Sequence, residues 1–214
     1  GLASPEAIRK SIEGSLERLR TDHVDLYYLH RPDPEIPIGD TLGALDELVR
    51  AGKVRAIGCS NFSAEQLADA DRVAREQGTA RFTALQNHYN LLRRDDDEDV
   101  LPLCRELEVA YIPYFPLASG LLTGKYRREQ AAPEGTRLAG RPIEDDQFES
   151  VERLARFAEK RGRTLHELAV AALASTPGIA SVIAGATKPE QVRANAAAVS
   201  WELDDEDLVA LRAI

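Results

Sequence analysis

The chain has 214 residues, of which 43% are hydrophobic and 29% are charged, and its formal net charge is −9. This composition is typical of a globular domain, and the acidic total disfavours nucleic acid as a general partner because phosphate binding requires clustered positive charge. We expect no membrane span, since no apolar stretch approaches about 20 residues. Cys59 and Cys104 form no CxxC pair, which favours free thiols in a cytoplasmic protein.

Helical and strand patterns alternate along the chain. The first helix opens at Ser4-Pro5-Glu6, with a capping serine and a proline at the first helical position. Strands are predicted at residues 24–30, 53–58, 82–86, 109–114 and 181–184. Further helices are predicted at residues 41–50, 63–78, 95–107, 147–160, 165–174, 189–198 and 204–212. This order predicts an α/β fold with a parallel sheet and right-handed crossovers.

Two parallel architectures fit this order. A closed (β/α)8 TIM barrel needs eight strands, typically in about 250 residues, whereas only five are predicted here. A doubly wound open sheet is the alternative, and it usually carries a glycine-rich turn after its first strand. The chain contains no GxGxxG and no GxxxxGK[ST] sequence, which disfavours the nucleotide-binding folds that depend on those motifs.

The run Val24–Asp33 ends in a histidine and a proline-marked loop. Its continuous apolar part predicts a strand buried on both faces, and Pro32 turns the chain into a loop. His30 would therefore lie at the carboxyl end of a parallel strand, where α/β barrels carry their catalytic side chains. A core histidine satisfied by one hydrogen bond is the alternative.

Polar or aromatic clusters follow the other predicted strands as well. These clusters are Ser60-Asn61-Phe62, Gln86–Asn90, Tyr114–Gly120 and Gly185–Gln191. Since the carboxyl ends of parallel strands meet on one rim, the clusters together predict an active site on that rim. Taken singly, Ser60-Asn61 could be a helix-initiating loop and Tyr114 a core residue.

The last cluster opens a helix, and helix N-termini favour anions. Lys188 adds a cation there, and Gln191 and Asn195 share one helix face. This arrangement predicts a clasp for an adenosine phosphate, and a capped helix with a solvated face is the alternative.

The segment Ser119–Pro142 is long, rich in glycine and basic. It carries Lys125, Arg127, Arg128, Arg137 and Arg141. A loop longer than about 15 residues in a compact domain is usually functional, and this charge suits a lid over a pyrophosphate. A disordered insertion at residues 127–142 is the alternative.

Other catalytic and metal-binding motifs are weak or missing. The run Asp95–Asp99 lacks the glycine and the spaced final acid of a calcium loop, so acids at a helix start are the favoured interpretation. The four histidines show no zinc spacing, and no serine lies in GxSxG. We therefore expect neither a metal site nor hydrolase chemistry of that kind.

The chain resembles the aldo/keto reductases over nearly its whole length. The resemblance rests on the colinear stretches VDLYYLHRPD, GKVRAIGCSNF, LQNHYNLLRR, YIPYFPLASGLLTGKY and VIAGATKPEQVRANAAA. It implies a (β/α)8 barrel that binds NADP(H) without a Rossmann motif and transfers hydride to small-molecule aldehydes and ketones. Residues 1–214 would form a single domain.

The resemblance also implies roles for individual residues. His30 would orient the carbonyl substrate, Tyr114 would stack on the nicotinamide, and Ser60, Asn61 and Gln86 would hold its carboxamide. The pyrophosphate loop would contain Leu117, Ser119, Gly120, Leu122 and Lys125. The adenosine 2′-phosphate end would be held by Gly185, Thr187, Lys188, Gln191 and Asn195.

The family's Asp-Tyr-Lys-His tetrad is represented here only by His30. The other three residues lie on earlier segments in the family, and the chain has no methionine, so we expect a C-terminal portion with about five of eight strands, inactive on its own. A non-catalytic NADP-binding module, like the channel-associated relatives, and a half-barrel that dimerises through its open edges are the alternatives.

Overall fold

The computed structural model describes residues 2–126, 128, 130, 132 and 134–214, so Arg127 lies outside the described residues. Contacts divide the chain into two compact units. The sheet unit comprises the residues up to Asn87 together with Asp96–Tyr111, and the helical unit comprises His88–Asp95 and Ile112–Ile214. A single domain over residues 1–214 stays a prediction.

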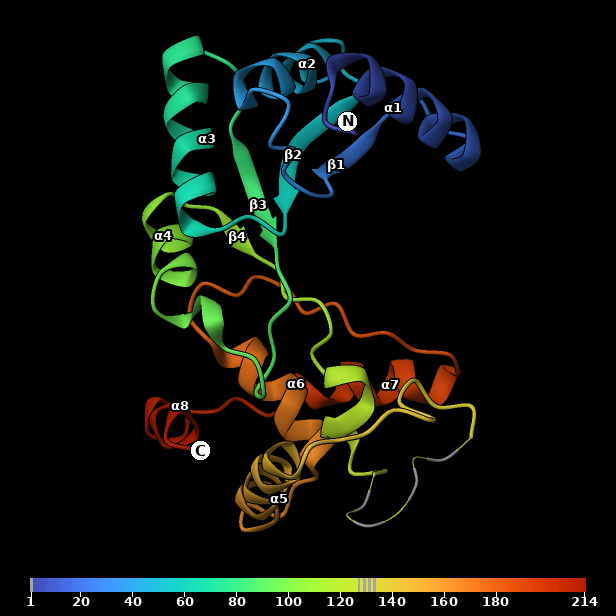
Figure 1. Cartoon of the computed structure of the whole chain (residues 1–214), viewed down its shortest axis with the longest axis vertical. Coiled ribbons are helices and arrows are strands. Elements are labelled where there is room, and N and C mark those ends of the chain that lie inside the picture. The colour runs from blue at the N-terminus through green and yellow to red at the C-terminus, as the bar shows by residue number, and fades with distance from the viewer. Residues whose placement is uncertain (1, 127, 129, 131, 133) are drawn as a thin grey trace. The chain divides into compact units, whose positions relative to one another are not determined.

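The sheet unit is an α/β layer whose elements alternate along the chain (Figure 1). Its elements are α1 (Pro5–Leu19), β1 (Val24–Leu29), α2 (Ile38–Arg50), β2 (Val54–Ser60), α3 (Ala64–Gln77), β3 (Phe82–Gln86), α4 (Val100–Glu106) and β4 (Ala110–Tyr111). The strands pair in the order β1-β2-β3-β4, and every pairing is parallel. The predicted α/β class with a parallel sheet is confirmed.

The register aligns the carboxyl ends of the first three strands. Leu29 lies opposite Cys59, and Ser60 lies opposite Gln86. A Cβ atom on Gly58 would lie 2.6 Å from Cε1 of Tyr28 and 3.0 Å from the carbonyl oxygen of Ala84. Glycine at this position therefore lets the Tyr28 ring lie against β2.

Local capping residues define the helix ends of this unit. Ser4 caps α1 by accepting a hydrogen bond from the Ala7 N–H, and Pro5 begins the helix as predicted. Ser63 and Gln66 form a reciprocal capping box at the start of α3, and Gly78 ends that helix at φ 66°. Both helix starts were therefore correctly predicted from the sequence.

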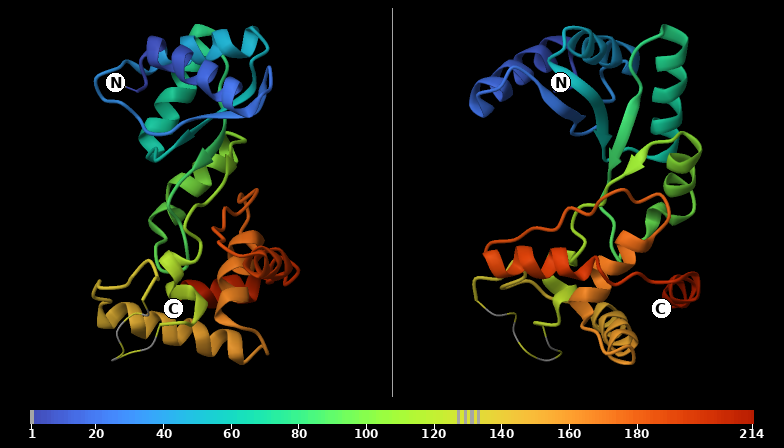
Figure 2. Two further views of the ribbon diagram at one scale, coloured as in Figure 1. Left: turned by 90° about the vertical axis from the view of Figure 1, so that its right-hand side faces the viewer. Right: turned by 180° about the vertical axis from the view of Figure 1, so that it is seen from behind.

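The helical unit has no multi-residue strand among its described residues (Figure 2). Its helices are η2 (Ala118–Thr123, a 3-10 helix with a kink), α5 (Asp145–Glu159), α6 (Leu165–Ser175), α7 (Pro189–Ala198) and α8 (Asp205–Arg212). The short 3-10 helix η1 (Asp95–Asp97) spans the chain boundary between the units. α6 packs against α5, α7 and η2, and Leu168, Ala169 and Ala171 on α6 are fully buried.

The predicted strand at residues 181–184 is wrong. Among the described residues, only Ile183 of this segment forms a bridge, to Tyr114, and its N–H donates to the Pro113 carbonyl at 3.0 Å. The predicted strand at 109–114 likewise shortens to Ala110–Tyr111 with an isolated bridge at Tyr114. Proline has no N–H to donate, so Pro113 interrupts the ladder that both segments would share.

The expectation that residues 24–29 are buried on both faces is also wrong. Asp25 is exposed and only Leu29 is classed as buried in β1, because β1 is an edge strand of the described sheet. The helix predicted at 41–50 begins earlier, at Ile38, after Pro37. Within the described part of the chain, no helix has the length and apolar character needed to cross a membrane.

Candidate active site

Four predicted site residues of the sheet unit meet at the carboxyl ends of β1, β2 and β3. The Ser60 hydroxyl donates to the Gln86 carbonyl oxygen at 2.6 Å, and the Asn61 N–H donates to the same oxygen at 3.1 Å. The Asn61 amide Nδ2 donates to the His30 carbonyl at 2.9 Å and to Ser60 Oγ at 3.0 Å. These bonds join the ends of three strands into one polar cluster.

Asn61 adopts a left-handed backbone conformation, with φ 61°. Asparagine tolerates this region better than most residues because its short amide bonds locally. The side chain thereby turns back over β1 instead of continuing along β2. The contacts of Asn61 require both the left-handed backbone conformation and the side-chain amide. A β-branched residue could supply neither.

His30 follows β1 directly and is exposed, so the core-histidine alternative does not hold. Its side chain borders a cavity of about 430 Å³ that runs along β1. The cavity lining is mainly apolar, with Tyr27, Tyr28 and Leu29 from β1 and Leu45 from α2. Burial raises the pKa of the Tyr28 hydroxyl, which keeps that ring neutral beside the histidine.

Tyr114 of the helical unit lies in an aromatic group with His88 and Phe115. The His88 and Tyr114 rings stack with centroids 5.3 Å apart and planes 20° apart. Phe115 meets both rings edge-on, at 5.3 Å from His88 and 5.2 Å from Tyr114. The Tyr114 ring is therefore oriented by two aromatic neighbours.

The turn that follows Tyr114 holds the predicted pyrophosphate residues. Ala118, Ser119 and Gly120 have successive positive φ values of 45°, 57° and 100°. A Cβ atom on Gly120 would lie 2.6 Å from Lys125 Nζ, so glycine allows the ammonium to approach the turn backbone. This places a cation against the turn.

Leu117 and Leu122 complete the turn. The Leu117 carbonyl accepts from the Gly120 N–H at 2.7 Å and from the Leu122 N–H at 3.3 Å. Leu117 is half-buried and the Leu122 side chain is fully buried. Leu122 therefore belongs to the packed interior of the turn, and Leu117 closes the turn through its carbonyl.

The basic loop brings Arg137 close to two predicted groups. The Arg137 guanidinium lies 5.5 Å from the centroid of the Phe115 ring. A Cβ atom on Gly185 would lie 3.7 Å from Arg137 Nη2. Arg128 pairs with Asp145 and Glu152 of α5 instead, at 3.4 and 3.5 Å.

The segment at the start of α7 is organised by Gln191. Its Oε1 accepts from the Thr187 N–H at 2.7 Å, the Lys188 N–H at 3.2 Å and the Thr187 hydroxyl at 3.2 Å. These three bonds all end on Oε1. The two hydrogens on Nε2 can therefore be donated to a ligand. Gly185, Thr187 and Lys188 are exposed.

Asn195 lies one turn further along α7 and bonds to α6. His166 Nε2 lies 2.8 Å from Asn195 Oδ1, which fixes the orientation of the Asn195 amide. Asn195 also borders an apolar cavity of about 440 Å³ between α6, α7 and residues 179–184. The structure therefore places Gln191 and Asn195 on α7, as predicted, and gives each a defined amide orientation.

The acidic run Asp95–Asp99 has structural roles in the described chain. Asp96 Oδ2 accepts from the Tyr111 hydroxyl at 2.6 Å and from Asn87 Nδ2 at 2.8 Å, Asp95 pairs with Arg93 at 3.0 Å, and Asp99 caps α4. No group of three or more potential metal ligands occurs among the residues that the structure describes. The run is explained by capping and pairing.

Both cysteines are buried free thiols, as expected. Burial raises the pKa of Cys59 well above its ordinary value and that of Cys104 to about 12. A thiol in this state is a poor nucleophile. The polar groups at the strand ends are thus the candidates for chemistry.

Comparison with known proteins identifies the family. The model of the family described as "Aldo/keto reductase family" matches residues 2–214. The chain belongs to the aldo/keto reductase family. It is 37% identical over 212 residues to the aldo-keto reductase YhdN of Bacillus subtilis, covering 96% of this chain and 62% of that protein.

Two other relatives carry names of a different kind. The NADH-specific methylglyoxal reductase of Escherichia coli is 34% identical over 216 residues, covering 98% of this chain and 64% of that protein. A putative voltage-gated potassium channel subunit beta of Schizosaccharomyces pombe is 34% identical over 209 residues, covering 92% and 60%. The chain thus spans about three fifths of the length of these relatives.

Sequence reasoning missed the side chains that contact the predicted site residues. His88, Asn90 and His166 were not assigned roles, although each contacts a predicted site residue or its neighbour. His88 and Asn90 lie in a cluster that follows a predicted strand, which was a usable signal. His166 lies inside a helix pattern, and nothing local distinguishes it from a surface residue.

Proposed function

We propose that this protein is an NADP(H)-dependent oxidoreductase that reduces aldehydes or ketones to alcohols. The carrying observation is the hydrogen-bonded cluster of His30, Ser60, Asn61 and Gln86 at the carboxyl ends of three parallel strands, in a chain of the aldo/keto reductase family. When bound, a reduced nicotinamide supplies the hydride that the carbonyl carbon accepts.

The groups in the sheet unit fit a carboxamide. A carboxamide offers one acceptor and two donors, and Ser60, Asn61 and Gln86 carry hydroxyl and amide groups of complementary kinds. Tyr114, in the helical unit, supplies an aromatic face suited to a planar ring. Ser60, Asn61 and Gln86 would hold the carboxamide, and His30 would donate a hydrogen bond to the substrate carbonyl oxygen.

The helical unit carries cations suited to the phosphates of the dinucleotide. The turn with Leu117, Ser119, Gly120 and Leu122 would shape the pyrophosphate site, and Lys125 approaches that turn closely. Arg137, which lies near both Phe115 and Gly185, would close the basic loop over the pyrophosphate as a lid. Cations paired with phosphate form charge-assisted hydrogen bonds, which are stronger than neutral ones.

The adenosine end would be held at α7. Gln191 and Asn195 present amide donors, and Thr187 and Gly185 border the site. Lys188 would pair with the 2′-phosphate, which favours NADP over NAD. Because the Escherichia coli relative is described as NADH-specific, this preference needs its own test.

The proton that completes the alcohol requires an acid. The resemblance assigns this role to a tyrosine, assisted by a lysine and an aspartate, which in the family lie before the part of the barrel that this chain matches. General acid catalysis contributes typically about 10²–10⁴-fold, so we expect residues 1–214 alone to be inactive. The intact mass of the native protein would show whether such segments precede Gly1.

Activity is tested with the full-length native protein, NADPH and 4-nitrobenzaldehyde as a broad aldehyde substrate. We expect NADPH oxidation that falls at least about tenfold in His30→Gln, while NADPH affinity stays within twofold, because His30 contacts substrate and not cofactor. His23→Gln is the matched control, since His23 lies on the surface paired with Asp22. Bound cofactor without turnover would contradict the reductase assignment.

A second function is a nucleotide-sensing subunit. It is favoured by the similarity to proteins named as potassium channel beta subunits in Schizosaccharomyces pombe and Arabidopsis thaliana. Tight NADPH binding with negligible turnover of several aldehydes would support this alternative over the enzyme.

A further inference from the structure

The His88 ring stacks on one face of the Tyr114 ring. The two rings are offset-stacked at 5.3 Å, so a planar ligand can stack only on the opposite face of Tyr114. The pairing is reinforced by the backbone, since His88 and Tyr114 form a parallel bridge and the Tyr89 N–H donates to the Tyr114 carbonyl at 3.4 Å. His88 thus supports the Tyr114 ring from one face.

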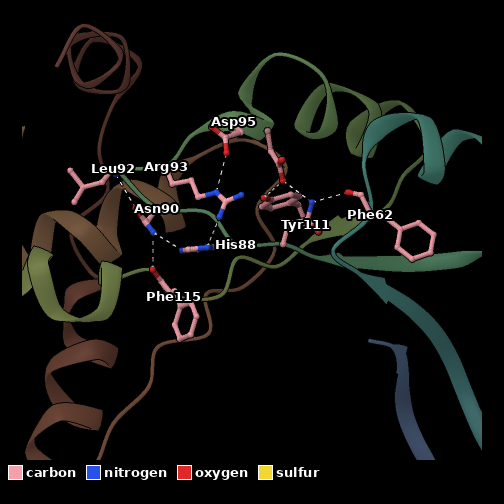
Figure 3. A network of polar contacts seen from close by, with 10 residues as sticks. Phe62, His88, Asn90, Leu92, Arg93, Asp95, Tyr111 and Phe115 are labelled. Carbon is pink, nitrogen blue, oxygen red and sulfur yellow. Dashed lines mark hydrogen bonds and ion pairs between the residues drawn. The ribbon is translucent and has the colours of Figure 1, made fainter. Parts of the chain in front are cut away.

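Arg93 fixes the rotation and the tautomer of the His88 ring (Figure 3). Arg93 Nη1 lies 2.9 Å from His88 Nδ1, and Arg93 Nε donates to Asp95 Oδ2 at 3.0 Å. A guanidinium has only donors, so His88 Nδ1 is the acceptor and the proton lies on Nε2. The ring is therefore neutral and held by Arg93 at Nδ1, while Asn90 Nδ2 lies 3.4 Å from the other ring nitrogen, Nε2 (Figure 3).

Asn90 fixes the turn that follows Tyr114. Its Nδ2 donates to the Phe115 carbonyl at 3.0 Å, and its Oδ1 accepts from the Leu92 N–H at 2.9 Å (Figure 3). Phe115 has φ 57°, a conformation that costs a non-glycine residue energy. Asn90 is buried, and its bond holds this conformation directly beside Tyr114.

We propose that His88, pinned by Arg93, is a positioning residue that sets the plane of the Tyr114 ring for the nicotinamide. This inference rests on the proposed function, because it takes Tyr114 as the stacking residue. His88 contacts neither cofactor nor substrate in this account. It acts through Tyr114, and Arg93 and Asp95 act through His88.

Residues 88–93 form the positioning segment. They follow β3 and hold Tyr114 from the side through ring stacking, backbone pairing and the Asn90 amide. Because every one of these contacts lies within the helical unit, the plane of the Tyr114 ring is set inside that unit. A residue at position 88 that lacks a ring would remove the stacked one of the two aromatic neighbours that orient the Tyr114 ring.

The test compares two nucleotides in the full-length protein. NADPH carries the nicotinamide, whereas adenosine 2′,5′-bisphosphate carries only the adenosine end. We expect His88→Ala to weaken NADPH binding roughly fivefold, the size of a lost aromatic pair, and to leave the bisphosphate affinity within about twofold. His88→Phe restores the stacked face, so NADPH affinity should return to within about twofold of the wild type.

Further variants separate the possible failures. Arg93→Ala leaves the ring present but unpinned, and we expect a smaller loss for NADPH alone; this variant serves if His88→Ala does not fold. The proposal is overturned if Tyr114→Ala weakens NADPH binding but His88→Ala and Arg93→Ala do not, or if both nucleotides weaken equally. A wild-type protein that binds neither nucleotide contradicts the proposed function itself, and the proposal falls with it.

Discussion

In the sheet unit, Ser60 and Gln86 lie in strands whose parallel pairing fixes their positions. In the helical unit, Tyr114 precedes a turn and Gln191 lies in the first turn of α7, and side chains such as His88, Asn90 and Gln191 itself hold the surrounding backbone. Parallel pairing tolerates most side-chain changes at its ends because backbone groups make the bonds. A turn fixed by side chains depends on a few named residues, so single substitutions there should affect function more than stability.

The largest stability effect is expected in the sheet unit, at Gly58. Gly58→Ala would place a Cβ atom 2.6 Å from the Tyr28 ring and 3.0 Å from a backbone oxygen, so overpacking should lower the free energy of unfolding by about 3 kcal/mol. Urea denaturation measures this loss. Gly43→Ala, with open space around its Cβ position in α2, is the control and should stabilise slightly. Equal effects at both glycines would refute the packing explanation.

A smaller loss is expected in the helical unit at Asn90. Asn90→Ala removes two part-buried hydrogen bonds, to the Phe115 carbonyl and from the Leu92 N–H, which should together cost about 2 kcal/mol. NADPH affinity should fall as well, because the turn at Phe115 loses its support. Ser200→Ala, an exposed change in the same unit, should alter neither property. A loss of stability without a loss of affinity would separate this turn from the binding site.

Gln191 has both a capping and a proposed binding role, and two variants separate them. Gln191→Ala removes the cap of α7 and should cost about 1 kcal/mol in stability along with NADPH affinity. Gln191→Glu keeps the accepting oxygen, so stability should be retained while NADPH affinity falls through repulsion of the phosphate. Thermal unfolding and nucleotide titration measure the two properties. Unchanged NADPH affinity in Gln191→Glu would place the phosphate elsewhere.

The pH dependence of stability should carry a contribution from His88. Burial first, and then the charge of Arg93, hold its pKa below the ordinary 6.5, while the charge of Asp95 opposes this shift. The unfolded chain therefore binds more protons between the lowered pKa and 6.5, so the free energy of unfolding falls as pH decreases through that window. His88→Phe should remove this part of the slope. An unchanged slope would show that folding does not lower the pKa of His88.

The smallest effect is expected at a surface ion pair of the sheet unit. Arg9 and Glu47 meet at 2.8 Å, but both side chains are at least half exposed. Arg9→Ala should change the free energy of unfolding by less than about 0.5 kcal/mol, because solvent screens exposed pairs. A loss as large as that expected for Asn90→Ala would mean that this ion pair between α1 and α2 contributes far more to the stability of the sheet unit than an exposed pair should.

The two units also differ in what their sequence reveals. Ser4, Ser63 and Gly78 mark helix ends through local chemistry, and His30, Ser60 and Gln86 were located by counting strands. In the helical unit, the effect of Pro113 on two neighbouring segments is non-local, and the predicted strand at 181–184 failed for that reason. The exposure of β1 was missed because an edge strand cannot be recognised from its own apolar run.

The partners of the site residues were beyond local pattern reasoning. His88 and Tyr114 are separated by 25 intervening residues and meet only because their segments run in parallel. His166 reaches Asn195 across two helices. Such contacts depend on which two helix faces pack together. Helical periodicity predicts that a face is buried, but it does not predict which element packs against that face.

The most direct measurement is a titration of the full-length protein with NADPH and with NADH, for the wild type and for Lys188→Ala. The account predicts that the wild type binds NADPH more tightly, and that Lys188→Ala loses about tenfold in NADPH affinity while NADH affinity is unchanged, because the lysine would pair only with the 2′-phosphate. Equal loss for both nucleotides, or no binding of either by the wild type, would contradict the account.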